Sequence, residues 1–155
     1  MTSDVSASTD ALDRAVRLHV FGQAAETARV PQAPDVAAAL GQSVTEVESS
    51  LLRLAAGRVL ILAPNSTTIW APNPFCAVPS DVRVEALGRT YWAICIWDAL
   101  GIPAALHADA TVRAGCGDCA DELVLEVRDG ALTRGEGIVH FGVPAVRWWE
   151  NIGYT

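Results

Sequence analysis

The sequence lacks lysine: its 11 basic residues are all arginine, against 18 acidic residues, and the net charge is −7. An acidic surface repels a phosphate backbone, so we expect no nucleic-acid partner. No apolar run approaches the roughly 20 residues that a transmembrane helix needs. We therefore expect no membrane partner. Residues 1–10 lack the basic-then-apolar layout of a secretory signal. We therefore predict a cytoplasmic protein with a disordered tail over residues 1–10.

The chain has 155 residues, which is enough for one domain or two small lobes that share a core. Apolar residues make up 51% of it, and four of them are cysteines. In a reducing compartment, cysteines serve as reactive thiols or metal ligands more often than as disulfides. The cysteines are therefore the first candidates for functional residues.

The first half of the sequence predicts three helices followed by a hairpin. Residues 10–28 have a helical apolar period, with Asp10 placed to cap the helix, and residues 36–40 form a short helix that Gly41 ends. Ser43 and Glu46 form a capping box that opens a third helix reaching Ala56. Two short strands follow, over residues 58–63 and 67–71. This order predicts a winged-helix-like lobe over residues 11–72.

A winged-helix lobe often reads DNA with its third helix, so the charge of that helix matters. Its outward positions include Glu46, Glu48 and Arg53, and residues 1–72 are net acidic. A surface that follows phosphates needs the opposite sign. We interpret the lobe as structural, although a metal-responsive winged-helix regulator remains an alternative.

The second half predicts small antiparallel sheets around one helix, which makes the fold class α+β. A Pro-rich connector leads to a strand over residues 81–86, and Gly88-Arg89 then turns into a helix over residues 91–103 that Gly101 and Pro103 end. Asp129-Gly130 is a hairpin signal. Further strands are predicted at the following residues: 110–114, 122–128 and 138–143.

The most informative feature is a thiol and a carboxyl three residues apart, Cys95 and Asp98. On a helix this spacing places both side chains on one face, close enough to share a proton or a ligand. The surrounding residues are apolar or aromatic, with Tyr91, Trp92 and Trp97 nearby. A buried carboxyl has a raised pKa and carries a proton near neutral pH. The alternative is a core cysteine beside an aspartate that hydrogen-bonds to the following loop.

These residues also resemble those of a known family. The winged-helix-like lobe, the Pro-Phe connector, the Cys95-x-x-Asp98 motif with the following Ala-Leu-Gly-Ile-Pro, the hairpin with Cys116 and the segment from Ile138 to Trp149 are similar to the alkylmercury lyases. The resemblance covers residues 11–155 and is most specific over residues 92–104. It implies that residues 73–155 form the catalytic region.

The resemblance implies cleavage of a carbon–mercury bond in an organomercury small molecule. Cys95 would bind mercury as ligand and nucleophile, and Asp98 would relay a proton and contact the metal. No cofactor is implied, because mercury is substrate and product, and a downstream mercuric reductase is the implied partner. The family's second cysteine would follow Thr155, so with Cys95 alone we expect mercury capture to persist while turnover falls severely.

The remaining cysteines leave alternatives open. Cys116 and Cys119 form a Cys-x-x-Cys turn that can clamp a soft metal or form a redox pair, whereas a structural zinc site would need two more ligands, with His107 the nearest candidate. Either thiol would supply a second thiolate if this turn folded over Cys95. Cys76, His19 and His140 are interpreted as incidental or packed residues. A non-catalytic thiol protein that binds Hg(II) or Cu(I) is the other main hypothesis.

Overall fold

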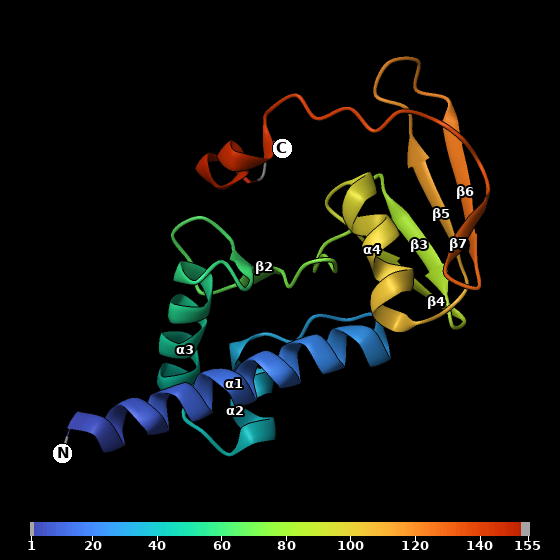
Figure 1. The fold of residues 1–155 in the computed structure, drawn as a ribbon. Helices are drawn as coiled ribbons and strands as arrows, with labels where there is room; N and C mark the ends of the chain where they lie inside the picture. The colour runs from blue at the N-terminus through green and yellow to red at the C-terminus, as the bar shows by residue number, and fades with distance from the viewer. Residues whose placement is uncertain (1, 153–155) are drawn as a thin grey trace.

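A computed structural model describes residues 2–152, with side chains from residue 9 onward, and confirms an α+β fold. Figure 1 shows a helical lobe that contains α1, α2 and α3 on one side and a sheet covered by α4 on the other. The elements in chain order are α1 (Thr2–Thr27), α2 (Ala33–Leu40), α3 (Val44–Ala56), β1 (Ile61–Leu62), β2 (Ile69–Ala71), β3 (Arg83–Ala86), β4 (Arg89–Trp92), α4 (Ile96–Leu106), β5 (Ala110–Gly115), β6 (Glu122–Arg128), β7 (Ala131–Arg134) and the 3-10 helix η1 (Ala145–Glu150).

The first lobe has the predicted order of three helices and an antiparallel hairpin of β1 and β2. Ser43 and Glu46 form the predicted capping box at the start of α3, and Gly41 ends α2 with a φ of 64°. The apolar faces of the three helices and the hairpin share one core, which includes the fully buried Val16 and Leu51. The Arg53 side chain of α3 is not free to contact DNA, because it forms an ion pair with Asp13 of α1 at 2.6 Å.

Two predictions for this lobe are wrong. Helix α1 already includes Thr2, so residues 2–10 are helical and Asp10 lies inside the helix instead of capping it, while Met1 lies outside the described residues. No glycine or proline occurs before Gly22, and a nucleated helix extends through such a stretch because each added residue gains a hydrogen bond.

The second region is a five-stranded antiparallel sheet in the order β4-β3-β5-β6-β7. Buried residues of β3, β5 and β6 form its core with Ala99 and Ile102 of α4. Strand β6 has the predicted bounds, and Asp129 and Gly130 both have positive φ, as the hairpin signal requires. The sheet thus provides a platform on which α4 lies.

Two other predictions for this region are wrong. Gly88 and Arg89 do not lead into a helix. Gly88 lies in the turn between β3 and β4, and Arg89 begins β4, in which Tyr91 and Trp92 pair with β3. Residues 138–143 are not a strand, and the outer strand of the sheet is instead β7. The Asp129-Gly130 turn folds β7 directly back onto β6, so that sheet position is filled by the nearer segment.

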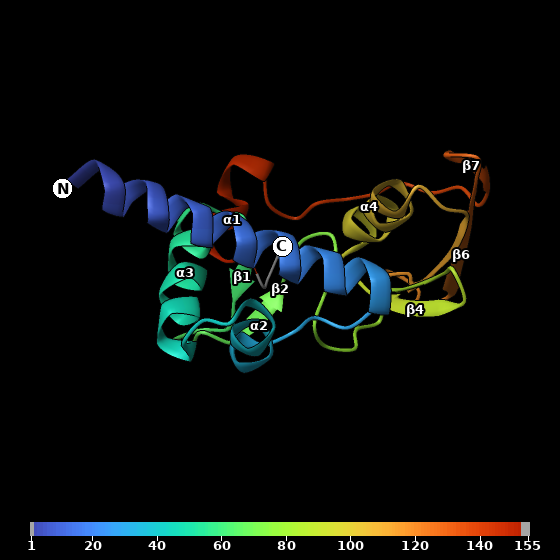
Figure 2. The same ribbon diagram turned by 90° about the horizontal axis from the view of Figure 1, so that it is seen from below.

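Helix α1 joins the two regions. Its central residues lie in the core of the first lobe, whereas Ala24 belongs to the core of the sheet. The Tyr91 hydroxyl of β4 also donates a hydrogen bond to the Ala25 carbonyl at 2.8 Å. Figure 2, which views the molecule from below, shows α1 crossing in front of the first lobe and ending beside β4. Among the described helices, α1 included, none combines the length and the apolar character that crossing a membrane requires.

Candidate active site at the start of helix α4

Cys95 and Asp98 meet at the beginning of α4. Cys95 is the N-cap residue, with extended φ and ψ of −144° and 174°, and Asp98 lies in the first turn, three residues later. The Cys95 thiol lies 3.5 Å from Asp98 Oδ2, as a donor to the carboxylate. The predicted proximity is therefore confirmed. The predicted reason is wrong, because Cys95 precedes the helix and reaches Asp98 as an N-cap side chain reaches the third helical residue.

Helix α4 is longer than predicted at its other end. Gly101 and Pro103 do not end it, and it continues to Leu106, with His107 as a left-handed C-cap at a φ of 49°. Pro103 is buried inside the helix although it has no backbone N–H to donate. Gly101 lets α4 lie close to the connector, because a Cβ at this position would be 3.2 Å from Pro74 Cβ.

Cys95 and Asp98 line one small cavity of about 50 Å³. The other lining residues come from the connector, from α4 and from the C-terminal segment: Asn73, Ile94, Trp97, Phe141, Trp148 and Ile152. The wall is thus mostly apolar, with three aromatic side chains. Tyr91 and Trp92, which the sequence placed beside the thiol, are absent from the lining.

A wider apolar groove of about 690 Å³ adjoins the small cavity and shares Trp97, Phe141 and Trp148 with it. The Phe141 ring lies edge-on to Trp97 at 6.3 Å between centroids and contacts Trp148 at 4.8 Å. Aromatic contacts of this kind hold ring positions more firmly than area burial alone. The three rings therefore form a common wall between the thiol and the groove.

The C-terminal segment runs from the sheet back to the first lobe and contributes one side of the cavity (Figure 1). Figure 1 shows the chain leaving β7 and returning past α4 to η1, beside the β1–β2 hairpin. Trp148 Nε1 donates a hydrogen bond to the Val143 carbonyl at 2.8 Å, and the Arg58 guanidinium lies 5.5 Å from the ring centroid of Trp149. The cavity is therefore built from three parts of the chain.

Burial controls the ionisation of both functional groups. It raises the pKa of the Asp98 carboxyl, and the contact with Cys95 offsets part of this rise. Burial also raises the pKa of the Cys95 thiol, and the backbone amides of Asp98 and Trp97 oppose the rise, whereas the Asp98 charge adds to it. The pair thus holds protons more strongly than the same groups in water.

Two further groups near the pair were not predicted as functional. The Asn73 Oδ1 atom is buried without a hydrogen-bond partner, and Asn73 lines the cavity. Such an acceptor is usually satisfied by an ordered water or a bound molecule. Cys76 is buried, and burial raises its pKa, with a further rise from the Asp98 charge.

Comparison with known proteins gives a family and a similar fold. The family model for alkylmercury lyase (MerB) matches residues 75–155, just over half of the chain. The chain belongs to the alkylmercury lyase family. The fold is similar to that of the mercury-bound form of MerB2, with a TM-score of 0.60 and 17% sequence identity. That match covers 80% of this chain and 66% of MerB2, slightly under two thirds, and no curated protein sequence matches.

The other predicted residues of this family member lie apart from the cavity. Cys116 and Cys119 are exposed in the β5–β6 turn and are absent from the lining, so the structure does not fold this turn over Cys95. His107 is the C-cap of α4, at the helix end opposite Cys95. Thr155, before the position implied for a second cysteine, lies outside the described residues. Within residues 2–152, no group of three or more histidine, cysteine, aspartate or glutamate side chains could hold a metal ion.

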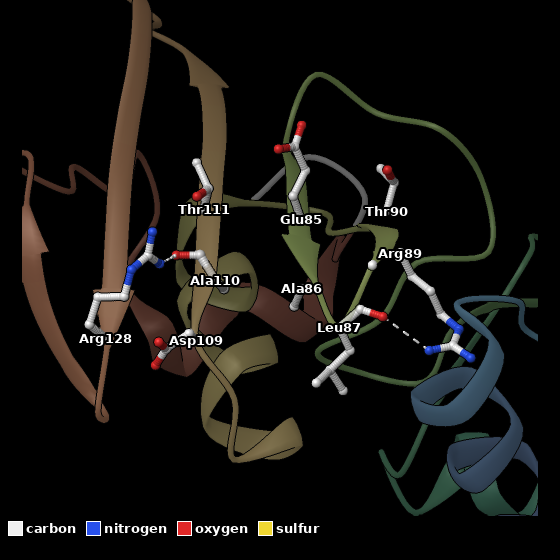
Figure 3. Close-up of a pocket in the computed structure, with 10 residues that line it drawn as sticks. Glu85, Ala86, Leu87, Arg89, Thr90, Asp109, Ala110, Thr111 and Arg128 are labelled. Atoms are coloured by element: carbon white, nitrogen blue, oxygen red, sulfur yellow. Dashed lines mark hydrogen bonds between the residues drawn. The ribbon is translucent and has the colours of Figure 1, made fainter.

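A separate hollow of about 510 Å³ lies at the β3–β4 turn (Figure 3). Its lining contains no cysteine, and its arginines already hold backbone carbonyls: Arg128 donates to Ala110 at 2.9 Å and Arg89 to Leu87 at 3.2 Å. Asp109, also in the lining, follows the C-terminal end of α4. The hollow is therefore about one helix length from Cys95.

Sequence reasoning missed the residues that enclose the site. Phe141, Trp148 and Ile152 are more than 40 positions away from Cys95 in the sequence, and no local spacing connects them to it. Of the adjacent Trp148 and Trp149, only Trp148 lines the cavity. An aromatic pair in the sequence does not show which ring will face a site.

Proposed function

We propose that this chain is a carbon–mercury lyase in which Cys95 captures mercury and Asp98 protonates the carbon. The observation that supports this most directly is the 3.5 Å approach of Cys95 Sγ to Asp98 Oδ2 in a mostly apolar cavity. Residues 73–155 would form the catalytic region. The substrate would be an organomercury compound, and no cofactor is needed.

In the first step, the Cys95 thiolate attacks mercury in R–Hg–X. A sulfur–mercury bond forms, the mercury–X bond breaks and X leaves with its electron pair. Soft thiolates suit soft metals better than oxygen or nitrogen ligands do. The thiol must first lose its proton, and the neighbouring carboxylate, which accepts a hydrogen bond from it, is the nearest base.

In the second step, Asp98 donates that proton to the carbon as the carbon–mercury bond breaks. The products are the hydrocarbon R–H, mercury on Cys95 and the Asp98 carboxylate, whose charge balances the cationic metal. The raised pKa of Asp98 favours its protonated form at higher pH than an exposed aspartate would allow. One proton therefore passes from sulfur to oxygen to carbon.

The organic group would lie in the apolar groove beside Trp97, Phe141 and Trp148. This groove adjoins the cavity with the thiol, so mercury at Cys95 leaves R directed toward apolar surface. Burial of a hydrocarbon or phenyl group there is favourable. The groove therefore favours alkyl and aryl substrates over charged ones.

Release of the product needs a further thiol. Cys95 is the only cysteine that lines the cavity within the part of the chain described by the structure. A small thiol from solution would then be the second ligand that removes mercury. We propose a cytoplasmic setting, where such thiols are available, and a mercuric reductase as the downstream consumer of Hg(II).

The test is hydrocarbon release from phenylmercury by residues 1–155, measured by gas chromatography with and without a small thiol. We expect benzene in both cases: about one equivalent without the thiol, and continued but slow turnover with it. In D₂O, the benzene should carry one deuterium, because the proton comes from an exchangeable group. Asp98→Asn should retain mercury capture and lose about 10²- to 10⁴-fold in benzene release.

Asp129→Asn is the matched control, because it makes the same change in the exposed β6–β7 turn, where asparagine tolerates positive φ. Its rate should equal that of the unmodified chain. Mercury capture without benzene release would refute the lyase and identify a non-catalytic thiol protein. Equal rates for Asp98→Asn and the unmodified chain would refute the role of Asp98.

A further inference from the structure

The β5–β6 turn brings two thiols together on the surface. Strands β5 and β6 pair up to Gly115 and Glu122, and the turn between them contains Cys116 and Cys119. The turn is closed by hydrogen bonds from the Cys116 amide to the Asp121 carbonyl at 2.8 Å and from the Ala120 amide to the Cys116 carbonyl at 2.9 Å. Both thiols are free and exposed. The pair is therefore accessible and already folded into one tight loop.

The turn also favours a thiolate. The backbone amides of Cys119 and Asp118, together with the Cys119 side chain, lower the pKa of Cys116. The Asp121 amide lowers the pKa of Cys119, but the side chains of Cys116 and Asp121 outweigh it, so that this pKa is raised. Cys119 Sγ lies 3.3 Å from Asp121 Oδ2. Cys116 is therefore the more acidic of the two thiols.

The number of ligands decides which metal suits the turn. Among the described residues, no third histidine, cysteine or carboxylate joins the two thiols in a metal-binding group. A structural zinc site needs four ligands, so zinc is a poor fit. Hg(II) and Cu(I) are soft ions that two thiolates can satisfy. Two sulfurs and no further ligand therefore select for a thiophilic ion of low coordination number.

We propose that Cys116 and Cys119 form a second soft-metal site, separate from Cys95, that holds one Hg(II) or Cu(I) ion between two thiolates. Binding of Hg(II) forms two sulfur–mercury bonds, and the two thiol protons pass to solvent. The acidic neighbours Asp118 and Asp121 favour a cation at this surface. The site does not depend on lyase activity, because neither thiol lines the Cys95 cavity.

The position of the turn suits a site near the products of Cys95 chemistry. Helix α4 starts after Cys95, and the chain then returns along β5 to the turn. Figure 1 accordingly shows the β5–β6 turn at the same end of the sheet as the beginning of α4. The Cys116–Cys119 pair and Cys95 therefore lie toward the same end of the sheet (Figure 1).

The test uses a Cys76→Ala/Cys95→Ser variant, in which only the Cys116–Cys119 pair remains, under reducing-agent-free anaerobic conditions. With one equivalent of mercuric chloride, native mass spectrometry should show one chain with one mercury and the loss of two protons. The matched control adds Cys119→Ser and leaves a single thiol. Against excess glutathione, the pair should retain mercury at least about 100-fold better than the single thiol, because the second bond is intramolecular.

A second measurement covers the case in which the double variant does not fold. The unmodified chain is titrated with Cu(I) against a chromophoric Cu(I) chelator, beside Cys119→Ser and Cys76→Ala. The unmodified chain and Cys76→Ala should retain one more equivalent than Cys119→Ser. Equal retention in all three, or mercury bound between two chains instead of within one, would overturn the proposal. Loss of benzene release with the extra equivalent intact would refute only the lyase.

Discussion

The starts of α3 and α4 have a pair of polar side chains at the same spacing, but only the pair in α3 caps its helix. Ser43 and Glu46 of α3 are the N-cap residue and the third helical residue, and so are Cys95 and Asp98 of α4. In α3, Ser43 Oγ accepts a hydrogen bond from the Glu46 amide at 3.2 Å, and Glu46 Oε2 accepts one from the Ser43 amide at 3.0 Å. In α4, the N-cap side chain makes no capping hydrogen bond.

Burial separates the chemistry of the two acids. Glu46 is exposed, and hydrogen bonds from Ser43 lower its pKa. Asp98 is half-buried, and burial raises its pKa. The spacing alone therefore specifies only that a side chain at the N-cap meets one at the third position. Whether the two side chains cap the helix or supply a thiol and a proton depends on their residue types and on how deeply they are buried.

The largest effect is expected from Cys95→Ser, which gives α4 the N-cap residue of α3. Mercury capture at α4 and hydrocarbon release should fall to the background without protein, because the thiolate is lost. The free energy of unfolding should rise by about 0.5–1 kcal/mol, since serine caps a helix that cysteine does not. Benzene release and denaturant unfolding measure the two effects. Unchanged release would contradict the role of Cys95.

The reverse exchange is Ser43→Cys in a Cys95→Ser background, which moves the thiol to the exposed helix start. The free energy of unfolding should fall by about 1 kcal/mol relative to Cys95→Ser, because the cap of α3 is lost. The new thiol should bind mercury but release no benzene, since Glu46 is exposed and lacks the raised pKa of Asp98. Benzene release from this variant would show that burial is unnecessary.

The smallest effects are opposite changes in the pH dependence of stability. The folded pKa of Asp98 is raised, so its stabilising contribution is present below its unfolded pKa near 4 and is lost as pH rises through the folded value. Asp98→Asn should therefore become more stable relative to the unmodified chain as pH rises from about 4 to 7.

The folded pKa of Glu46 is lowered from 4.5, so its contribution is present above that value and is lost as pH falls through the lowered one. Glu46→Gln should become less stable relative to the unmodified chain as pH rises over the acidic range. Melting temperatures of both variants, measured from pH 3 to 7 in about one-unit steps, give the two slopes. Slopes of the same sign would show that the two acids do not differ as described.

Much of the fold follows from local sequence. The capping box of α3, the Gly41 end of α2, the bounds of β6 and the Asp129-Gly130 turn were predicted correctly. Each of these features depends on residues within a few positions of one another. Turn and cap signals are reliable for this reason, because the groups that satisfy the backbone are part of the motif itself.

The errors occur where distant segments decide the local structure. Residues 91–95 are apolar and read as part of a helix, but pairing with β3 makes residues 91 and 92 strand and leaves Cys95 as the cap. A short apolar run fits either a helix or a strand, so its period cannot decide. Residues 138–143 likewise look like a strand, but β7 already fills the outer position of the sheet.

The sequence by itself determined that a thiol and a carboxyl would meet, because three residues of separation bring Cys95 and Asp98 together on a helix face and also at a helix start. Only the tertiary structure decided that they meet in a mostly apolar cavity. The connector supplies Asn73, and a segment more than 40 residues further along supplies Phe141 and Trp148. Burial in this folded site raises the pKa of Asp98.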